Sequence, residues 1–310
     1  MVPLVERLSK LCFKLENLHD HRLPEALSAS LQAFRYDVSS CITHQLLLNS
    51  NPAGLDTLSL EWIHKCFQVL PMINKAFAKL VVEIDYHASK WEAKTMEEYL
   101  NYSLDLLDLL NYFSSALSHL GLARLSLSHA LSLVKSSPSS AMERLKMIEF
   151  KSLRKEFKDQ ENKEDEKKRS SSDKEWVILQ ALLELRSTGF WVCSIVLAGL
   201  CGDDRAYLKM RRAAGALSNP ALINLDSIIC GVVTEKGCVL KEVRELKDSA
   251  DCLAAAIASK NGSDAAEEMQ RKLQEFEKLL DGLSKEVNCL FSELLAGRKE
   301  LLNGIRIQKP

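Results

Sequence analysis

Apolar side chains recur every three or four residues along most of this chain, which is the spacing of one face of an α-helix. The pattern predicts a first helix over about the first 20 residues and a second from Pro24 to about Leu48. After a loop at residues 49–54, a third helix is expected from Ser59 to Asp85. Pro71 lies inside this third helix and should bend it or divide it in two.

A fourth helix is expected to begin near Trp91 and to carry a packing seam. Its apolar residues alternate in steps of four and three, the spacing of coiled-coil seams. The pattern continues past Gly121 to Val134 and ends at residues 136–140. The seam consists of Leu106, Leu110, Phe113, Leu117 and Leu120.

The composition changes abruptly over residues 151–175, where nine basic and eight acidic side chains fall among 25 residues. Apolar residues nearly vanish after Phe157, so burial cannot offset the entropy cost of ordering this segment. We therefore predict a charged mobile linker. Three serines directly after a basic pair are candidate phosphorylation sites, with a plain solvated spacer as the alternative. They are Ser170, Ser171 and Ser172.

The chain after the linker again predicts helices: an apolar one over residues 176–200, one rich in small residues over 205–217, and one or two over 222–260. The last, from Asp264 to about Leu302, has the most regular heptad pattern. We expect this seam to pack within the chain, with pairing to another molecule as the alternative. Its residues form a candidate interaction surface: Met269, Leu273, Phe276, Leu280, Leu283, Val287, Leu290 and Leu294.

These patterns predict an all-α protein, an elongated multi-helix bundle of long antiparallel helices with the heptad seam on the C-terminal helix. We expect an N-terminal helical bundle over residues 1–150, the linker over 151–175, and C-terminal helices over 176–310 that pack on the same bundle. Only 12 of the 310 residues are Gly and 7 are Pro, too few for a collagen-like, low-complexity or many-stranded β protein.

Sixteen consecutive residues between Arg186 and Asp203 carry no charge. Gly189 and Gly199 in this run, like Gly121 in the fourth helix, are expected to mark kinks or close helix contacts. As a helix the sixteen residues would span about 24 Å, less than the roughly 30 Å hydrocarbon core of a bilayer. A buried central helix is expected, and a membrane-inserted segment with Lys209, Arg211 and Arg212 at the lipid headgroups is the alternative. The residues of this candidate membrane or core segment are Phe190, Trp191, Ile195, Val196, Leu197 and Leu200.

The charge balance excludes some partners. With 41 basic and 42 acidic residues the formal net charge is −1, which gives no electrostatic footprint for nucleic acid. Nine cysteines without a Cys-x-x-Cys motif are typical of reduced thiols. Glu6 and Lys10 interrupt any signal-peptide core, and the early acidic residues argue against a transit peptide. We therefore expect a cytoplasmic protein, with a peripheral or anchored position on endomembranes as the alternative.

No motif of catalysis or cofactor binding stands out. Glu61 and His64 have the Glu-x-x-His spacing of a di-iron bundle, but no second such pair occurs in the chain. His19 and His21 flank a single aspartate without further ligands. Phosphate-binding glycine loops and the nucleophile motif Gly-x-Ser-x-Gly are absent from the sequence. The sequence therefore predicts no enzyme, no cofactor and no metal site.

Three stretches of the sequence resemble the plant BYPASS family, whose members share a ROH-type domain: residues 58–62, residues 98–111 and residues 189–199. These are packing motifs, and the resemblance covers essentially the whole chain. It implies a plant developmental regulator of the type that restrains production of a root-derived mobile signal arresting shoot growth. Related members are described as binding exocyst subunits or acting in cold and salt responses. The resemblance carries over no catalytic residue.

We therefore predict a non-enzymatic helical regulatory or adaptor protein that acts through protein–protein contacts. Two alternatives remain open at this point. One is a membrane-associated trafficking factor that binds exocyst subunits, anchored through residues 190–200. The other is a carrier or enzyme in the metabolism of the mobile signal, which would need an apolar pocket between helices. The oligomeric state does not follow from the sequence.

Overall fold

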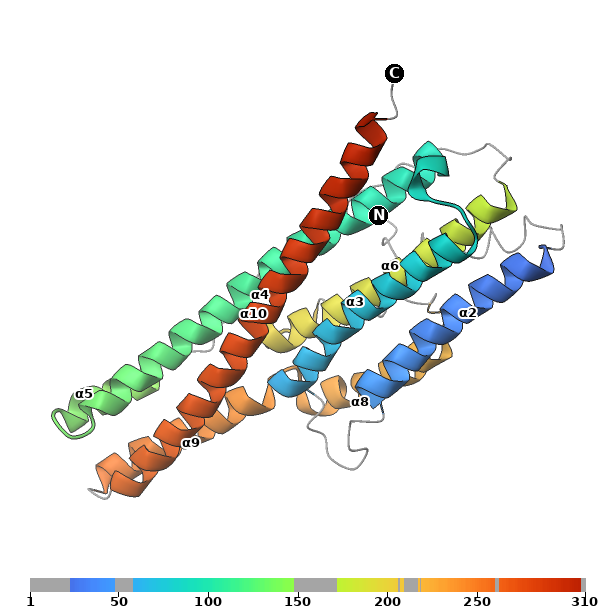
Figure 1. Ribbon diagram of the computed structural model, residues 1–310. Coiled ribbons are helices and arrows are strands. Elements are labelled where there is room, and N and C mark those ends of the chain that lie inside the picture. Colours follow the sequence, from blue (N-terminus) through green and yellow to red (C-terminus); the bar gives the residue numbers. More distant parts are fainter. Residues whose placement is uncertain are drawn as a thin grey trace.

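The structure is a computed structural model that describes residues 23–47, 58–147, 172–205, 207–208, 217, 219–259 and 262–307. Within these ranges every regular element is helical, as predicted (Figure 1). The α-helices are α2 (Glu25–Ile42), α3 (Leu60–Glu83), α4 (Ala93–Leu133), α5 (Pro138–Met147), α6 (Asp173–Cys201), α8 (Pro220–Lys236), α9 (Lys241–Ala258) and α10 (Ser263–Ile307). A π-helical turn, η1 (Thr43–Leu47), extends α2, and a 3₁₀ turn, η2 (Ala88–Lys90), precedes α4.

Side chains at the helix ends explain where several helices begin. The Ser59 hydroxyl accepts a hydrogen bond from the Trp62 amide at 3.1 Å and caps α3. Asn219 caps α8 in the same way, and Pro220 takes the first helical position, where its missing N–H costs nothing. Pro71 does not divide α3, which is one helix from end to end.

The long helices pack side by side in an elongated bundle (Figure 1). Helix α3 contacts α2, α6 and α10, while α4 contacts α5, α6 and α10. Helices α4 and α10 are antiparallel, because Arg124 pairs with Glu277 whereas Arg298 reaches back to the Leu100 carbonyl. Helices α4 and α6 run in the same direction. The Glu92 amide, just before α4, donates to the Glu175 carboxylate in the first turn of α6, and Arg186 of α6 donates to Glu98 of α4 further along both helices.

One hydrophobic core joins the parts of the chain on either side of the predicted linker. Phe67 of α3, Trp191 of α6 and Phe276 of α10 are fully buried members of it. Helix α6 begins at Asp173, so the last three residues of the predicted linker are helical. Residues 148–171, the predicted first helix and most of residues 205–217 lie outside the described residues.

Candidate interaction surfaces

The heptad seam of α10 lies inside the monomer. Its first six residues are at most 5% exposed, and Leu290 and Leu294 are partly buried against the same core. The helices that α10 contacts are α4, α9 and α3. Among the pairs at these contacts, Arg124 of α4 bonds Glu277 at 2.6 Å, and His64 of α3 lies 2.6 Å from Glu286. The seam side chains themselves are thus occupied by intramolecular packing.

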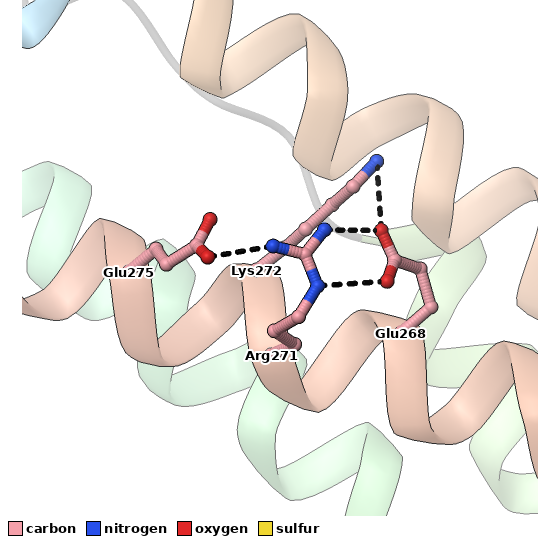
Figure 2. Close-up of polar contacts among 4 residues, drawn as sticks. All are labelled: Glu268, Arg271, Lys272 and Glu275. Atoms are coloured by element: carbon pink, nitrogen blue, oxygen red, sulfur yellow. Dashed lines mark hydrogen bonds and ion pairs between the residues drawn. The ribbon is translucent and has the colours of Figure 1, made fainter.

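The outer flank of α10 presents charged side chains bonded to one another along the helix (Figure 2). Arg271 donates to Glu268 one turn earlier and to Glu275 one turn later, each with a shortest distance of 2.6 Å. Lys272 lies 3.8 Å from the Glu268 carboxylate. The hydrogen bond from Arg271 lowers the pKa of Glu268, and the two carboxylates raise the pKa of Arg271. Both shifts favour the charged forms of Glu268 and Arg271.

The candidate membrane or core segment of α6 is buried in the bundle, and its six residues are each at most 7% exposed. Hydrogen bonds to one buried carboxylate also hold this segment. The Trp191 indole N–H donates to the Asp226 carboxylate at 3.0 Å, and the Tyr207 hydroxyl donates to the same carboxylate at 2.8 Å. Asp226 belongs to α8, so this contact holds α6 and α8 together.

Two glycines of α6 lie at close helix contacts, as the sequence predicted for this region. A Cβ added to Gly189 would lie 2.7 Å from the Tyr102 hydroxyl oxygen of α4. One added to Gly199 would lie 3.2 Å from an Ile63 methyl carbon of α3. Gly121 does not lie at a close helix contact, because no atom lies within 4 Å of an added Cβ. By length and composition, α6 is also the one helix among the described residues that could cross a membrane.

The third predicted serine, Ser172, caps α6. Its hydroxyl accepts a hydrogen bond from the Glu175 amide at 3.3 Å, which forms half of a capping box. The Glu175 carboxylate is fully buried and accepts instead from the Glu92 amide at 3.3 Å, at the start of α4. Ser172 itself is exposed, whereas Ser170 and Ser171 lie outside the described residues.

Two buried charged groups on α6 escaped the sequence analysis. Arg186 is 4% exposed and donates to Glu98 of α4 at 2.7 Å, with Asp105 at 3.8 Å. Glu184 accepts from Arg35 of α2 and from Asn219, both at 3.1 Å. Two opposite charges at the edge of an apolar run were the available signal, but their partners lie 88 and 149 positions away in sequence.

The described residues hold no group of three or more side chains that could bind a metal ion. Of the cysteines there, burial raises the pKa of Cys41 to about 11 and that of Cys238 to about 12. Burial also raises the pKa values of Cys66 and Cys193, which are completely enclosed. Such thiols are protonated at neutral pH, which makes them poor nucleophiles.

Comparisons with protein families and with curated proteins both find matches to this chain. The family model described as Protein BPS1 matches residues 60–303. Protein BPS1, chloroplastic, of Arabidopsis thaliana is 25% identical over 270 residues, which cover 81% of this chain and 77% of that protein. UPF0496 protein 4 of Oryza sativa subsp. japonica is 26% identical over 246 residues, covering 73% of this chain and 54% of the rice protein. No solved structure matches the chain.

The family match runs from the start of α3 into the last turns of α10, so it includes the core helices other than α2, which also contributes Phe34 to the core. It contains two of the stretches that carry the BYPASS resemblance, residues 98–111 and residues 189–199. The resemblance is thereby confirmed. The chain belongs to the BPS1 protein family.

Proposed function

We propose that this protein is a non-enzymatic regulator of plant growth that acts by binding other proteins. Membership of the BPS1 family supports a BYPASS-type developmental role, namely restraint of a root-derived mobile signal. The completely enclosed thiols of Cys66 and Cys193, whose pKa values burial raises, are poor candidates for a nucleophile. The same family background makes exocyst subunits the first proteins to test as partners.

The division of α10 into two faces carries the proposal. Its apolar seam is buried in the monomer, so a partner that binds this helix must contact the outer flank. There Glu268, Arg271 and Glu275 form a row of exposed ion pairs along the helix. A partner surface with alternating charges would complement this row and set the register of the contact.

Affinity capture from plant tissue with the full chain as bait tests this proposal. We compare the wild type with the flank variant Arg271→Glu/Lys272→Glu and with a matched variant on α9, Arg244→Glu/Lys247→Glu. Quantitative mass spectrometry should show a set of proteins, exocyst subunits among them, that the flank variant loses and the α9 variant keeps. Capture of the same proteins by all three baits would overturn the assignment to α10.

Membrane association is a second candidate, because α6 is long and apolar enough to cross a bilayer. Its contacts argue for the bundle instead: insertion would break the Arg186–Glu98 pair and the Trp191–Asp226 hydrogen bond. Flotation with liposomes distinguishes the two. We expect the protein to stay in the dense fraction, and recovery with the vesicles would favour the membrane role.

The cytoplasm remains our proposed compartment, although the name of the Arabidopsis relative describes that protein as chloroplastic. A fluorescent protein fused to the C-terminus leaves the N-terminal residues free for any import machinery. We expect diffuse cytoplasmic fluorescence in leaf cells. Fluorescence that coincides with chlorophyll would instead assign this chain to the compartment of its relative.

A further inference from the structure

One face of α2 is exposed along the whole helix, and α2 lies at one side of the bundle (Figure 1). The large side chain on this face belongs to Tyr36, which is 72% exposed. Its residues follow one another in alternating steps of three and four, so they share one side of the helix. The α2 outer face, as we call it hereafter, consists of Ala26, Ala29, Ala33, Tyr36 and Ser40.

Charged side chains flank the α2 outer face without lying on it. The charged residues between positions 26 and 40 are Arg35, which bonds a carboxylate of α6 at 3.1 Å, and Asp37, which bonds a lysine of α3 at 2.9 Å. The exposed Glu25 and His44 lie before and after the face. A surface helix normally presents charged residues on its outer side, so the composition of this face indicates that something covers it.

The chain directly before α2 carries a matching stripe of leucines. Residues 4–18 lie outside the described residues, and their five charged side chains all fall outside the stripe. The described chain resumes at Leu23, which packs against the core, so this segment ends within a few residues of α2. The leucines recur in steps of four and three: Leu4, Leu8, Leu11, Leu15 and Leu18.

The two stripes are mirror images about the connection between them. An antiparallel hairpin that turns at residues 19–24 brings Leu18 opposite Ala26 and, with each following step, ends with Leu4 opposite Ser40. The length of this connection is within the range of about two to eight residues that is usual between helices of a bundle. Both stripes correspond to about 22 Å of helix, so they match over their full length.

We propose that residues 4–18 dock as a helix on the α2 outer face, antiparallel to α2. Size favours this occupant, because leucine side chains fill the space over alanines, whereas the α2 outer face of a second copy would oppose alanine to alanine and bury little apolar area. The connection favours it further, because a short tether supplies the segment at an effective concentration on the order of millimolar. The proposal does not depend on the proposed function, which uses the outer flank of α10.

Hydrogen exchange of the full chain, followed by mass spectrometry, tests whether the segment is docked. Peptides from residues 4–18 of the wild type should exchange roughly tenfold more slowly than those of Ala33→Glu, which places a charge at the centre of the α2 outer face. Ala78→Glu, at an exposed alanine of α3, is the matched control and should keep the wild-type rate. Peptides of α4 report folding and should exchange alike in all three proteins.

Two results of this experiment would overturn the proposal. One is exchange of residues 4–18 in the wild type at the rate found in Ala33→Glu. The other is slow exchange that appears only after vesicles of anionic phospholipid are added, which would assign the segment to a membrane surface.

Disulfide cross-linking tests the orientation and the register. In a Cys12→Ser background, the pair Leu15→Cys/Ala29→Cys should form a disulfide within one chain when glutathione disulfide is the oxidant. The matched pair Asn17→Cys/Ala29→Cys places the first thiol on the far side of the docked helix and should give roughly tenfold less of this product. Peptide mapping identifies the bond, and sedimentation gives the mass of the product. Equal yields from both pairs would contradict the register, and a bond between two chains would assign the face to a second copy.

Discussion

Gly189 shows how a single residue fixes the spacing of two helices. A Cβ at this position would lie 2.7 Å from the Tyr102 hydroxyl oxygen, closer than atoms in van der Waals contact. The sequence indicated that glycines inside the apolar run mark close contacts, but it could not say which helix approaches. That information depends on Tyr102, which lies far away in the chain and is fully buried on α4.

Replacement of this glycine tests the contact. We expect Gly189→Ala to lower the free energy of unfolding by about 1–3 kcal/mol, because the added methyl group overpacks the site. Tyr102→Phe removes the nearest atom and should restore part of the loss in the double variant. Gly282→Ala on α10, where no atom lies within 4 Å, should stabilise by about 0.5–1 kcal/mol. Urea unfolding monitored by circular dichroism compares the wild type with these three single variants and the double variant, and equal effects at both glycines would contradict the contact.

Cys289 offers a second test at the scale of one residue, through its ionisation. Its thiol donates to the Glu293 carboxylate at 3.4 Å, and this hydrogen bond with the nearby negative charge raises the pKa of the thiol. A raised pKa means less thiolate at pH 8 and slower alkylation. Glu293→Gln should therefore speed the reaction of Cys289 with iodoacetamide, as measured by peptide mass spectrometry. Cys66, which is completely buried, is the internal control and should stay unmodified while the protein is folded.

At the scale of elements, the sequence predicted long helices well and their polar ends poorly. The heptad pattern located α10 to within a few residues, since an uninterrupted seam has to face one direction along the whole helix. By contrast, residues 173–175 were assigned to the linker because charged residues dominate the composition there. The capping pattern of Ser172 and Glu175 was the local signal for a helix start, and the charge count masked it.

The cap of α6 is open to direct test. Ser172→Ala should cost about 1 kcal/mol of stability and speed hydrogen exchange in the first turn of α6, because the Glu175 amide loses its acceptor. Ser172→Asp keeps an acceptor and places a negative charge at the helix N-terminus, so it should behave like the wild type. Hydrogen exchange followed by mass spectrometry compares the three proteins. Unchanged exchange in Ser172→Ala would show that the hydroxyl does not hold this turn.

At the scale of the whole molecule, pairing of helices depends on contacts that the sequence pattern does not contain. Helices α4 and α6 run parallel, held by Arg186 and Glu98, whereas the amphipathic periods alone suggested antiparallel neighbours throughout. Periodicity tells which face of a helix is buried but not against which helix. Ion pairs such as that of Arg35 on α2 with Glu184 on α6 determine which helices pack together, and the two residues of such a pair lie far apart in the chain.

The central claim of this account is that the α10 seam belongs to the core of one molecule, so that partners have to bind exposed surfaces. The thermal unfolding midpoint of Leu280→Asp tests it most directly. Leu280 is 5% exposed, so a charge there should cost on the order of 4 kcal/mol and lower the midpoint by roughly 10 °C or more. The control Lys278→Asp, on the exposed side of the same helix, should leave it nearly unchanged. A midpoint for Leu280→Asp equal to that of the wild type would contradict the claim.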